Sequence, residues 1–114
     1  MSDCLFCKIV AKEIPAEIVY ETGRTLAFQD INPQAPTHVL VIPKEHHANA
    51  AALAQADDGL ADEVLKTAHE VAVLRGVAES GYRIVFNTGP GAGQTVFHVH
   101  AHVLGGRDLT WPPG

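Results

Sequence analysis

Hydrophobic residues and histidines alternate along residues 97–104, which read Phe-His-Val-His-Ala-His-Val-Leu. Successive side chains of a β-strand point to opposite faces of a sheet, so a period of two separates these side chains into two rows. The imidazole row consists of His98, His100 and His102, and the apolar row of Phe97, Val99, Ala101 and Val103. We expect the apolar row to pack into a core. We expect the imidazole row to line a cleft, because burying three titratable rings without partners is costly.

Further strands are predicted from short apolar runs that are bounded by turn residues. Residues 18–20 and 25–28 flank a glycine-containing turn, which predicts an antiparallel hairpin. Residues 38–42 form an aliphatic run that Pro43 stops, a pattern typical of a central strand buried on both faces. Residues 82–86 predict one more strand ahead of the histidine segment.

Two helices are predicted. Apolar residues recur at three- and four-residue steps over residues 60–72, with Asp57 or Asp58 as the N-cap and Gly76 placed to end the helix. A shorter helix is expected from Cys4 to Ala11. Because strands and helices do not alternate along the chain, the order favours an α+β fold, an antiparallel sheet with the long helix on one face.

The chain of 114 residues is expected to form a single domain over residues 1–114. Its hydrophobic share of 46% and charged share of 18% are typical of a globular protein. A formal net charge of -5 without any run of lysine or arginine argues against a nucleic-acid polymer as partner. No basic N-terminal segment leads into an apolar stretch, and no run of about 18 apolar residues occurs, so neither export nor a membrane is expected and the cytoplasm is the default location.

The imidazole row admits two kinds of chemistry. Neighbouring histidines on a strand are roughly 6.5–7 Å apart and the outer pair roughly 13 Å, so one metal ion cannot easily bind all three. Nucleophilic catalysis accounts for the whole row better, because one imidazole can attack while the flanking rings orient it or carry the proton. The glycine-rich loop 89–95 precedes the row, and consecutive amides in such a loop can bind an anion. We therefore expect a phosphorus centre beside the nucleophile.

Cys4 and Cys7 form a Cys-x-x-Cys pair near the N-terminus. In a reducing compartment this spacing is typical of half of a zinc site or of a redox pair. A redox pair would need a thioredoxin-like strand-helix-strand unit, which does not follow in this sequence. Half of a zinc site is therefore favoured.

The segment 98–103, His-Val-His-Ala-His-Val, matches the motif His-φ-His-φ-His-φ-φ, in which φ is hydrophobic. Together with segments 30–44, 104–107 and 111–114, it resembles the Hint branch of the histidine triad (HIT) nucleotide-binding proteins, the nucleoside phosphoramidases. These segments cover nearly the whole chain. The resemblance implies a HIT-like five-stranded antiparallel sheet that continues across a homodimer.

The implied reaction is the hydrolysis of purine nucleoside 5'-phosphoramidates, in which AMP or GMP is joined to an amine through a P–N bond. His100 aligns with the nucleophile, which would attack the α-phosphorus and form a nucleotidyl-histidine intermediate that water then cleaves. His102 aligns with the residue that contacts the phosphate and assists the leaving group, and His38 with a histidine that relays protons. His98 is the first histidine of the triad. No cofactor is implied for catalysis.

The resemblance also implies a substrate site. Phe28, Asp30 and Ile31 match the base and ribose pocket, where a carboxylate would accept hydrogen bonds from the sugar hydroxyls. The positions beside the α-phosphate and the leaving group are matched by Asn87, Gly93, Gln94 and Thr95.

Three positions near this site bear on substrate choice or on departures from the family pattern. Thr95 stands where many relatives have serine, so its added methyl group crowds the leaving-group side and puts the amine preference in question. Gln29 differs from the histidine common in animal relatives, with no effect that the sequence assigns. Trp111 lies in a tail that, in the relatives, reaches the neighbouring subunit's active site; an aromatic anchor for the chain end is the alternative.

Some relatives complete a structural zinc site around the Cys-x-x-Cys pair with two histidines. Here the four ligands would be Cys4, Cys7, His46 and His98, and the metal would brace the strand that carries the nucleophile. Buried thiols without a metal are the alternative. His47 and His69 have no such support and are expected to be exposed to solvent.

Two other functions stay open at this point. The dinucleoside polyphosphate hydrolases of the Fhit branch share the histidine chemistry but lack the Trp-Pro-Pro-Gly ending. A nucleotide-binding scaffold without catalysis is the second alternative, although a scaffold has no physical need for an intact nucleophile.

Overall fold

The computed structural model describes residues 3–114. The helices are α1 (Leu5–Val10), α2 (Ala50–Ala56) and α3 (Leu60–Leu74), followed by the short 3-10 helix η1 (Pro90–Ala92). The strands are β1 (Ile18–Glu21), β2 (Thr25–Gln29), β3 (Thr37–Pro43), β4 (Tyr82–Val85) and β5 (Ala101–Gly105). None of the described helices is both long and apolar enough to cross a membrane.

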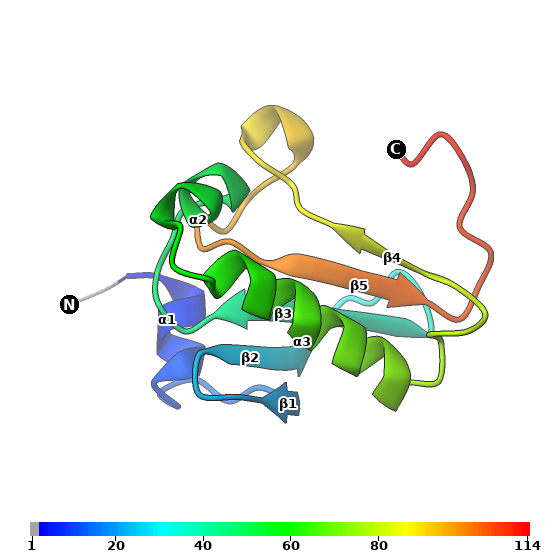
Figure 1. Cartoon of the computed structure of the whole chain (residues 1–114), viewed down its shortest axis with the longest axis horizontal. Helices are drawn as coiled ribbons and strands as arrows, with labels where there is room; N and C mark the ends of the chain where they lie inside the picture. The colour runs from blue at the N-terminus through cyan, green and yellow to red at the C-terminus, as the bar shows by residue number, and fades with distance from the viewer. Residues whose placement is uncertain (1–2) are drawn as a thin grey trace.

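The five strands form one antiparallel sheet in the order β1-β2-β3-β5-β4 (Figure 1). The predicted α+β class, the predicted hairpin and the two predicted helices are confirmed. The central strand β3 is buried along its whole length, as its aliphatic run predicts. Because β5 pairs with β3 in the middle of the sheet, residues near His102 and residues near His38 lie side by side although they are far apart in the sequence.

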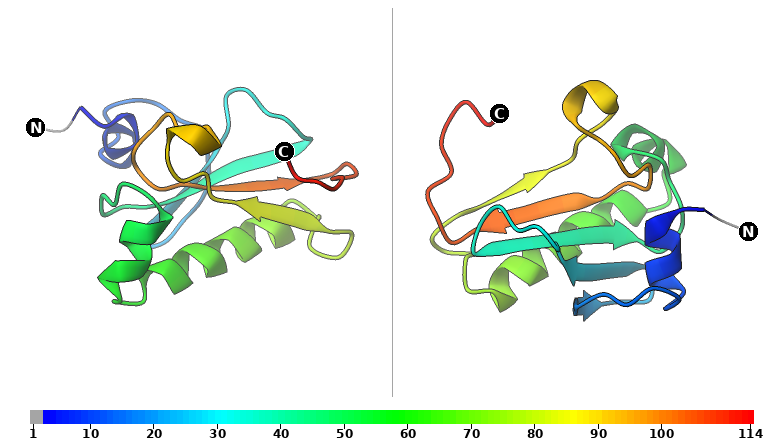
Figure 2. Two further views of the ribbon diagram at one scale, coloured as in Figure 1. Left: turned by 90° about the horizontal axis from the view of Figure 1, so that it is seen from above. Right: turned by 180° about the vertical axis from the view of Figure 1, so that it is seen from behind.

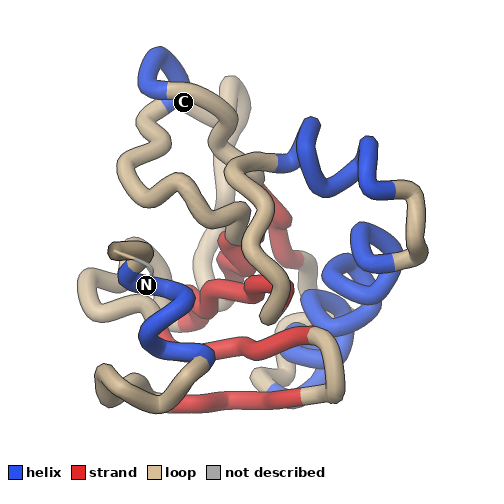
Figure 3. Tube along the Cα trace, turned by 90° about the vertical axis from the view of Figure 1, so that its left-hand side faces the viewer, coloured by secondary structure: helices blue, strands red, loops and turns tan. Residues whose placement is uncertain are grey.

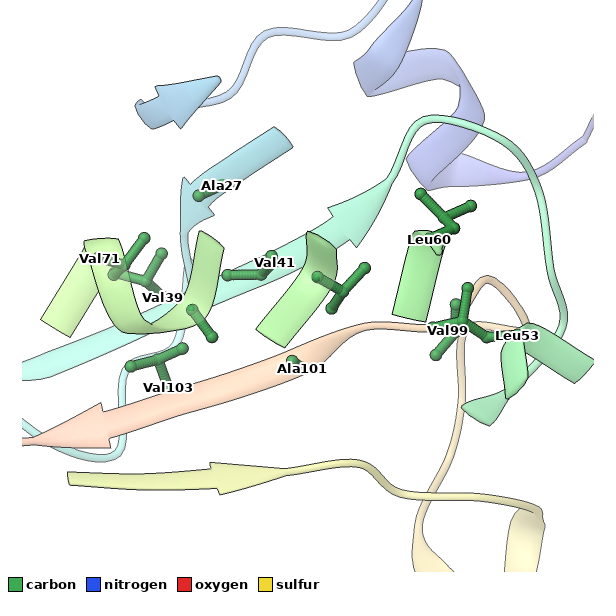
Figure 4. Close-up of a cluster of buried hydrophobic side chains, with 11 residues drawn as sticks. Ala27, Val39, Val41, Leu53, Leu60, Val71, Val99, Ala101 and Val103 are labelled. Atoms are coloured by element: carbon green, nitrogen blue, oxygen red, sulfur yellow. The ribbon is translucent and has the colours of Figure 1, made fainter. Parts of the chain in front are cut away.

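The long helix α3 covers one face of the sheet, and a core of small aliphatic side chains fills the space between them (Figures 1 and 4). The sheet side of this core includes Ala27, Val39, Val41, Ala101 and Val103, and the helix side includes Leu60, Val64, Ala68 and Val71. Each of these positions is at most 1% exposed. The apolar row of the histidine segment therefore faces α3, as predicted for Val99, Ala101 and Val103.

The opposite face of the sheet is covered by α1 at one end only (Figures 2 and 3). Phe6 and Ile9 of α1 pack there against side chains of β2 and β3, namely Leu26, Phe28, Leu40 and Ile42. Leu40 pairs directly with His102 across β3 and β5, so this second face also carries the imidazole row.

The structure corrects three of these expectations. A helix, α2, lies at 50–56, where none was predicted, and Asp57 is its left-handed C-cap rather than the start of the next helix. The N-cap of α3 is Gly59, while the side chain of Asp58 accepts from Leu60 N at 3.2 Å and pairs with Arg24. Helix α3 nevertheless ends where predicted, with Gly76 in the left-handed region just after its C-cap.

The third correction concerns the histidine segment, because β5 begins only at Ala101. Pro43 has no amide to continue the ladder, its carbonyl oxygen binds the His98 side chain, and Val99 N instead donates to His47 O at 2.7 Å. Phe97 is also 48% exposed rather than part of the core. His98 and His100 therefore lie in the connection before the strand, and only His102 lies within it.

Candidate active site

His38 and His102 form a hydrogen-bonded pair on adjacent strands. The Nε2 atom of His38 lies 2.9 Å from Nδ1 of His102, and Gln34 N donates to Nδ1 of His38 at 3.0 Å. Because Nδ1 of a neutral imidazole that accepts a hydrogen bond carries no proton, the proton of His38 lies on Nε2 and points to His102. Nδ1 of His102 is then the acceptor, so the proton of His102 lies on its outer nitrogen, Nε2.

The carboxylate of Asp30 completes this group, which we call the relay cluster (Asp30, His38 and His102). Its Oδ2 lies 3.4 Å from Nε2 of His38, and its Oδ1 accepts from Asn32 N at 2.7 Å. Burial is the largest influence on both rings. It lowers the pKa of His102 to about 4 and also lowers the pKa of His38, while the Asp30 charge raises both to a smaller extent. Both rings are therefore neutral near pH 7, in agreement with the hydrogen bonds.

His100 has the opposite proton arrangement. Its Nδ1 lies 2.8 Å from the His98 carbonyl oxygen, which can only accept, so the proton lies on Nδ1 and Nε2 keeps its lone pair. The ring is half-buried, its centroid lies 5.0 Å from that of His102, and Phe6 packs edge-on against it at 5.1 Å. A ring nitrogen with a lone pair thus stands beside a ring that carries an outward proton, which is the pairing of a nucleophile with a general acid.

His98 points to a different cluster. Its Nε2 donates to the Pro43 carbonyl oxygen at 2.8 Å, which leaves Nδ1 without a proton. This Nδ1 lies 3.4 Å from Sγ of Cys4 and 3.5 Å from Sγ of Cys7, and Nδ1 of His46 lies 3.4 Å from Sγ of Cys7. We call these four residues the cysteine-histidine cluster. The ring of His98 is 0% exposed, and burial lowers its pKa to about 4.

The cysteine-histidine cluster fits a zinc ion. All four ligand atoms lie within 4.8 Å of one another, and a tetrahedral ion with ordinary Zn–S and Zn–N bonds separates its S and N ligands by roughly 3.5 Å. The Pro43 carbonyl supplies the outer hydrogen bond that metal-bound histidines usually make. Cys4 is the N-cap of α1 and accepts from Cys7 N at 3.4 Å, so the first turn of this helix holds both sulfur atoms in place.

The relay cluster also brings its three ligand atoms within 4.8 Å of one another, but it does not fit a metal. A metal on Nε2 of His38 would move the proton to Nδ1, where it would meet the Gln34 N–H at 3.0 Å. Two donors would then face each other inside the protein, which is costly. The geometry instead suits proton transfer.

The glycine-rich loop differs from its predicted form. The amides of Gly89, Ala92, Gly93 and Gln94 all donate within residues 89–94, so they do not make a row of open anion-binding groups. Three groups make no hydrogen bond within the described part of the chain: the amide of Thr95, its hydroxyl, and the side chain of Asn87. These three groups, beside the loop, can therefore still contact a phosphate.

The other predicted substrate residues are distributed unevenly. Phe28 is only 4% exposed and packs edge-on against Phe6 at 5.4 Å, whereas Ile31 is fully exposed in the loop that follows β2. Trp111 is 82% exposed in the C-terminal tail, which leaves the sheet after β5 (Figure 1). The described chain thus brings together His98, His100, His102, His38 and Asp30, whereas the side chains of Ile31 and Trp111 are exposed to solvent.

Four features of the site had no signal in the sequence. Three of them are contacts to histidines between 4 and 94 residues away: the main-chain N–H of Gln34 with His38, the Pro43 carbonyl with His98, and the edge-on Phe6 ring with His98 and His100. His47 is the fourth, because its side chain is only 17% exposed and pairs with Glu45 at 2.7 Å, contrary to the expected exposure. His69 is exposed as predicted and lies 3.0 Å from the Tyr82 hydroxyl.

Comparison with known proteins identifies what the chain resembles. The sequence pattern of the HIT domain matches residues 11–109. A 14 kDa zinc-binding protein of Zea mays is 48% identical over 99% of this chain and 89% of its own length. The adenylylsulfatase HINT1 of Arabidopsis thaliana is 46% identical over 99% of this chain and 78% of its own length. A crystal structure of a HIT family hydrolase from Legionella pneumophila superposes with a TM-score of 0.94, at 52% identity over 98% of this chain and 100% of that one.

Proposed function

Since the chain belongs to the HIT domain family, we propose that it hydrolyses purine nucleoside 5'-phosphoramidates through a covalent nucleotidyl-His100 intermediate. The observation that carries this proposal is the 2.8 Å contact between Nδ1 of His100 and the His98 carbonyl oxygen; because the carbonyl can only accept, the proton lies on Nδ1 and Nε2 is ready to attack. HIT family hydrolases among its structural relatives support hydrolysis as the type of reaction. The nature of the bond that is cleaved is our inference from the site.

In the first step, Nε2 of His100 attacks the α-phosphorus and the P–N bond breaks. The leaving nitrogen takes the proton from Nε2 of His102, and the His38 N–H that points to Nδ1 of His102 stabilises the charge left behind. In the second step, water attacks the phosphorus, the bond between phosphorus and Nε2 of His100 breaks with its electron pair returning to Nε2, and a water proton passes to His102. Over the whole cycle, His102 gives one proton to the amine and receives one from water, so atoms and charge balance. No cofactor takes part in these steps.

The nucleotide would lie along the edge of the relay cluster. Asp30 is proposed to accept from the ribose hydroxyls, with Phe28 and Ile31 as the apolar side of the base pocket. On the phosphate side we propose contacts from Asn87 and Thr95, because both keep unsatisfied polar groups. Gly93 would let the backbone approach closely, since its φ of 88° suits glycine alone.

We propose a structural zinc ion in the cysteine-histidine cluster, in line with the zinc-binding relative of Zea mays. Cys4, Cys7, His46 and His98 would hold it. When bound, the metal would supply a rigid anchor and no chemistry toward the substrate. Since the His98 carbonyl fixes the proton of His100, holding His98 also orients the nucleophile.

A homodimer is the proposed assembly. Strand β4 is an edge of the sheet, and α3 exposes a stripe at four-residue spacing beside it, formed by Leu65, His69 and Val73. The His69–Tyr82 contact joins this stripe to β4. A second copy that paired through β4 would cover both. We expect a sedimentation mass of twice 12.2 kDa, reduced to the monomer by Val73→Asp.

Hydrolysis of adenylyl sulfate is the second candidate, because one relative is named an adenylylsulfatase. The nucleophilic step would be the same, with sulfate in place of the amine. Sulfate leaves as a stable anion and needs no proton, whereas an amine needs one. The two activities therefore make different demands on His102.

One experiment separates these functions. The protein is incubated with adenosine 5'-phosphoramidate, adenylyl sulfate and diadenosine triphosphate, each turnover is measured, and an acid-labile nucleotidyl adduct is trapped. The same assays follow for His100→Asn and for the control Thr67→Val, whose hydroxyl bonds to Thr25 on the α3 face of the sheet, away from the site. We expect the phosphoramidate to be preferred and His100→Asn to lose about 10⁴-fold or more in kcat. Preference for the dinucleotide would indicate a Fhit-type enzyme, and no turnover at all would indicate a scaffold.

A further inference from the structure

The side chain of Gln94 is fully used within the protein. It is 4% exposed, its Oε1 accepts from Gly89 N at 2.9 Å, and its Nε2 donates to Ala48 O at 2.7 Å and to Val96 O at 3.1 Å. A glutamine amide has two hydrogens to donate, and both are taken. The side chain therefore has no hydrogen left for a substrate, although its position in the sequence places it among the phosphate-side residues.

These bonds determine the shape of the glycine-rich loop. Gln94 N also donates to Gly89 O at 3.1 Å, so two hydrogen bonds join residues 89 and 94 and close the loop. Gly89 and Gly93 both have positive φ, at 87° and 88°, so the backbone between them turns sharply. The short helix η1 within the loop buries no side chain. Hydrogen bonds of Gln94, rather than packing, therefore hold this loop in place.

The contact with Ala48 ties the loop to a second part of the site. Ala48 lies between His46, a member of the cysteine-histidine cluster, and α2, which begins after the N-cap Asn49. The next residue after Gln94 is Thr95, whose amide and hydroxyl are proposed to contact the phosphate. A shift of Gln94 would thus move Thr95 relative to His100.

We propose that Gln94 is a positioning residue, which holds the loop 89–94 against the Ala48 carbonyl and thereby places Thr95 beside the reacting phosphorus. The expected effect of Gln94 on the hydrolysis rate rests on the proposed function, whereas its effect on the structure of loop 89–94 does not. Catalytic groups that are displaced by about 1 Å can lose about 100-fold in rate. Substrate binding in the ground state depends less on such alignment, because its contacts are spread over the nucleoside.

The test uses Gln94→Met, which keeps the length of the side chain and removes all three hydrogen bonds. Gln94→Glu is the second variant; it keeps the acceptor for Gly89 N and places a carboxylate against two carbonyl oxygens. The control is Thr67→Val, which removes the buried 2.7 Å hydrogen bond to Thr25 on the α3 face of the sheet. We expect both Gln94 variants to lower kcat by about 10- to 100-fold with KM changed less than about 3-fold, whereas the control lowers Tm and leaves kcat unchanged.

A second measurement does not depend on turnover. Hydrogen exchange of the Gly89 amide is followed by NMR in all four proteins. Exchange is expected to become about 10-fold faster or more in Gln94→Met and to stay slow in Thr67→Val, because only the first loses the acceptor of that amide. If the parent protein hydrolyses no phosphoramidate, the proposed function fails and the exchange result alone decides whether Gln94 holds the loop. Unchanged Gly89 exchange in Gln94→Met, an unchanged kcat, or a rise in KM alone would each overturn the proposal.

Discussion

Two clusters of potential metal ligands lie on the same face of this sheet, and only one of them fits a metal. The cysteine-histidine cluster and the relay cluster each bring their ligand atoms within 4.8 Å of one another. In each cluster, one buried histidine has a ring nitrogen that points away from the other ligand atoms. The clusters differ in the main-chain group that contacts this nitrogen. For His98 this group is the Pro43 carbonyl, an acceptor, and for His38 it is the Gln34 amide, a donor.

This difference decides which nitrogen carries the proton. An acceptor behind His98 draws its proton away from the sulfur atoms and leaves a lone pair for a metal. A donor behind His38 forces its proton toward His102 and makes the pair a path for protons. A single backbone group on the far side of each ring therefore separates a cluster that fits a metal from one that suits proton transfer.

Among the tests of this comparison, breaking the relay cluster has the largest expected effect. His102→Asn removes the proton that the leaving amine needs, so we expect kcat for adenosine 5'-phosphoramidate to fall by about 10²–10⁴-fold. Turnover of adenylyl sulfate should fall by less than about 10-fold, because sulfate leaves without a proton. Steady-state assays of both substrates measure the ratio. An equal loss for the two substrates would mean that His102 acts on the phosphate rather than on the leaving group.

The sequence was sufficient to predict the sheet, the long helix and the grouping of the histidines, because each depends on local periodicity. The alternation of residues 97–104 correctly placed Val99, Ala101 and Val103 in the core. It failed for Phe97, and it predicted strand over residues 97–100, where the chain has not yet joined the ladder. The cause is Pro43, which lies on another strand and ends the pairing there.

The proton positions could not be predicted from the sequence. They depend on contacts such as His98 with Pro43, which are 55 residues apart, and no local pattern records them. The glycine loop shows the same limit. Its composition suggested open amides, but a single side chain, Gln94, uses the Gly89 amide and helps close the loop.

The metal preference of the two clusters gives the second test of the comparison. Cys7→Ser is expected to abolish zinc binding, whereas Asp30→Asn should retain about one zinc ion per chain. Free zinc at 100 times its Kd would stabilise the parent by about 2.7 kcal/mol, so a chelator should lower the Tm of the parent and of Asp30→Asn but not of Cys7→Ser. Metal analysis and thermal unfolding provide the two readouts. Loss of zinc from Asp30→Asn would place the metal in the relay cluster.

Acid should weaken the fold through the relay cluster. In the folded protein the pKa of His102 lies near 4, below the ordinary value of 6.5, and the pKa of His38 is also lowered. As pH falls from 6.5 toward 4, these histidines take up protons in the unfolded chain but stay neutral in the folded protein. The free energy of unfolding is therefore greatest above pH 6.5 and decreases below it. The free energy of unfolding decreases by at most about 1.4 kcal/mol per pH unit for each ring.

Urea unfolding between pH 4.5 and 7.5, compared with His102→Asn, measures this contribution. The variant should show a shallower decline, because the unfolded chain has one site fewer to protonate. Nitrogen NMR of the parent at pH 7.5 should in addition find the proton of neutral His38 on Nε2 and that of neutral His100 on Nδ1. Equal slopes for the two proteins would contradict the buried, neutral state assigned to His102.

The smallest expected effect comes from Phe6, whose ring packs against both His98 of the cysteine-histidine cluster and the nucleophile candidate His100. Its centroid lies 6.0 Å from that of His98 and 5.1 Å from that of His100, edge-on in both cases. Phe6→Leu should cost about 1–2 kcal/mol of stability and lower kcat about 3- to 10-fold, because the nucleophile loses one wall of its pocket.

The matched control for Phe6→Leu is Val71→Ala, which opens a cavity of comparable cost in the core under α3 and should leave kcat unchanged. Zinc content is measured on the same samples. A lower kcat at full zinc occupancy in Phe6→Leu would show that packing, and not only the metal, transmits the position of His98 to His100. An equal loss of kcat in Val71→Ala would instead mean that the site follows global stability, and that His98 and His100 are not linked through this ring.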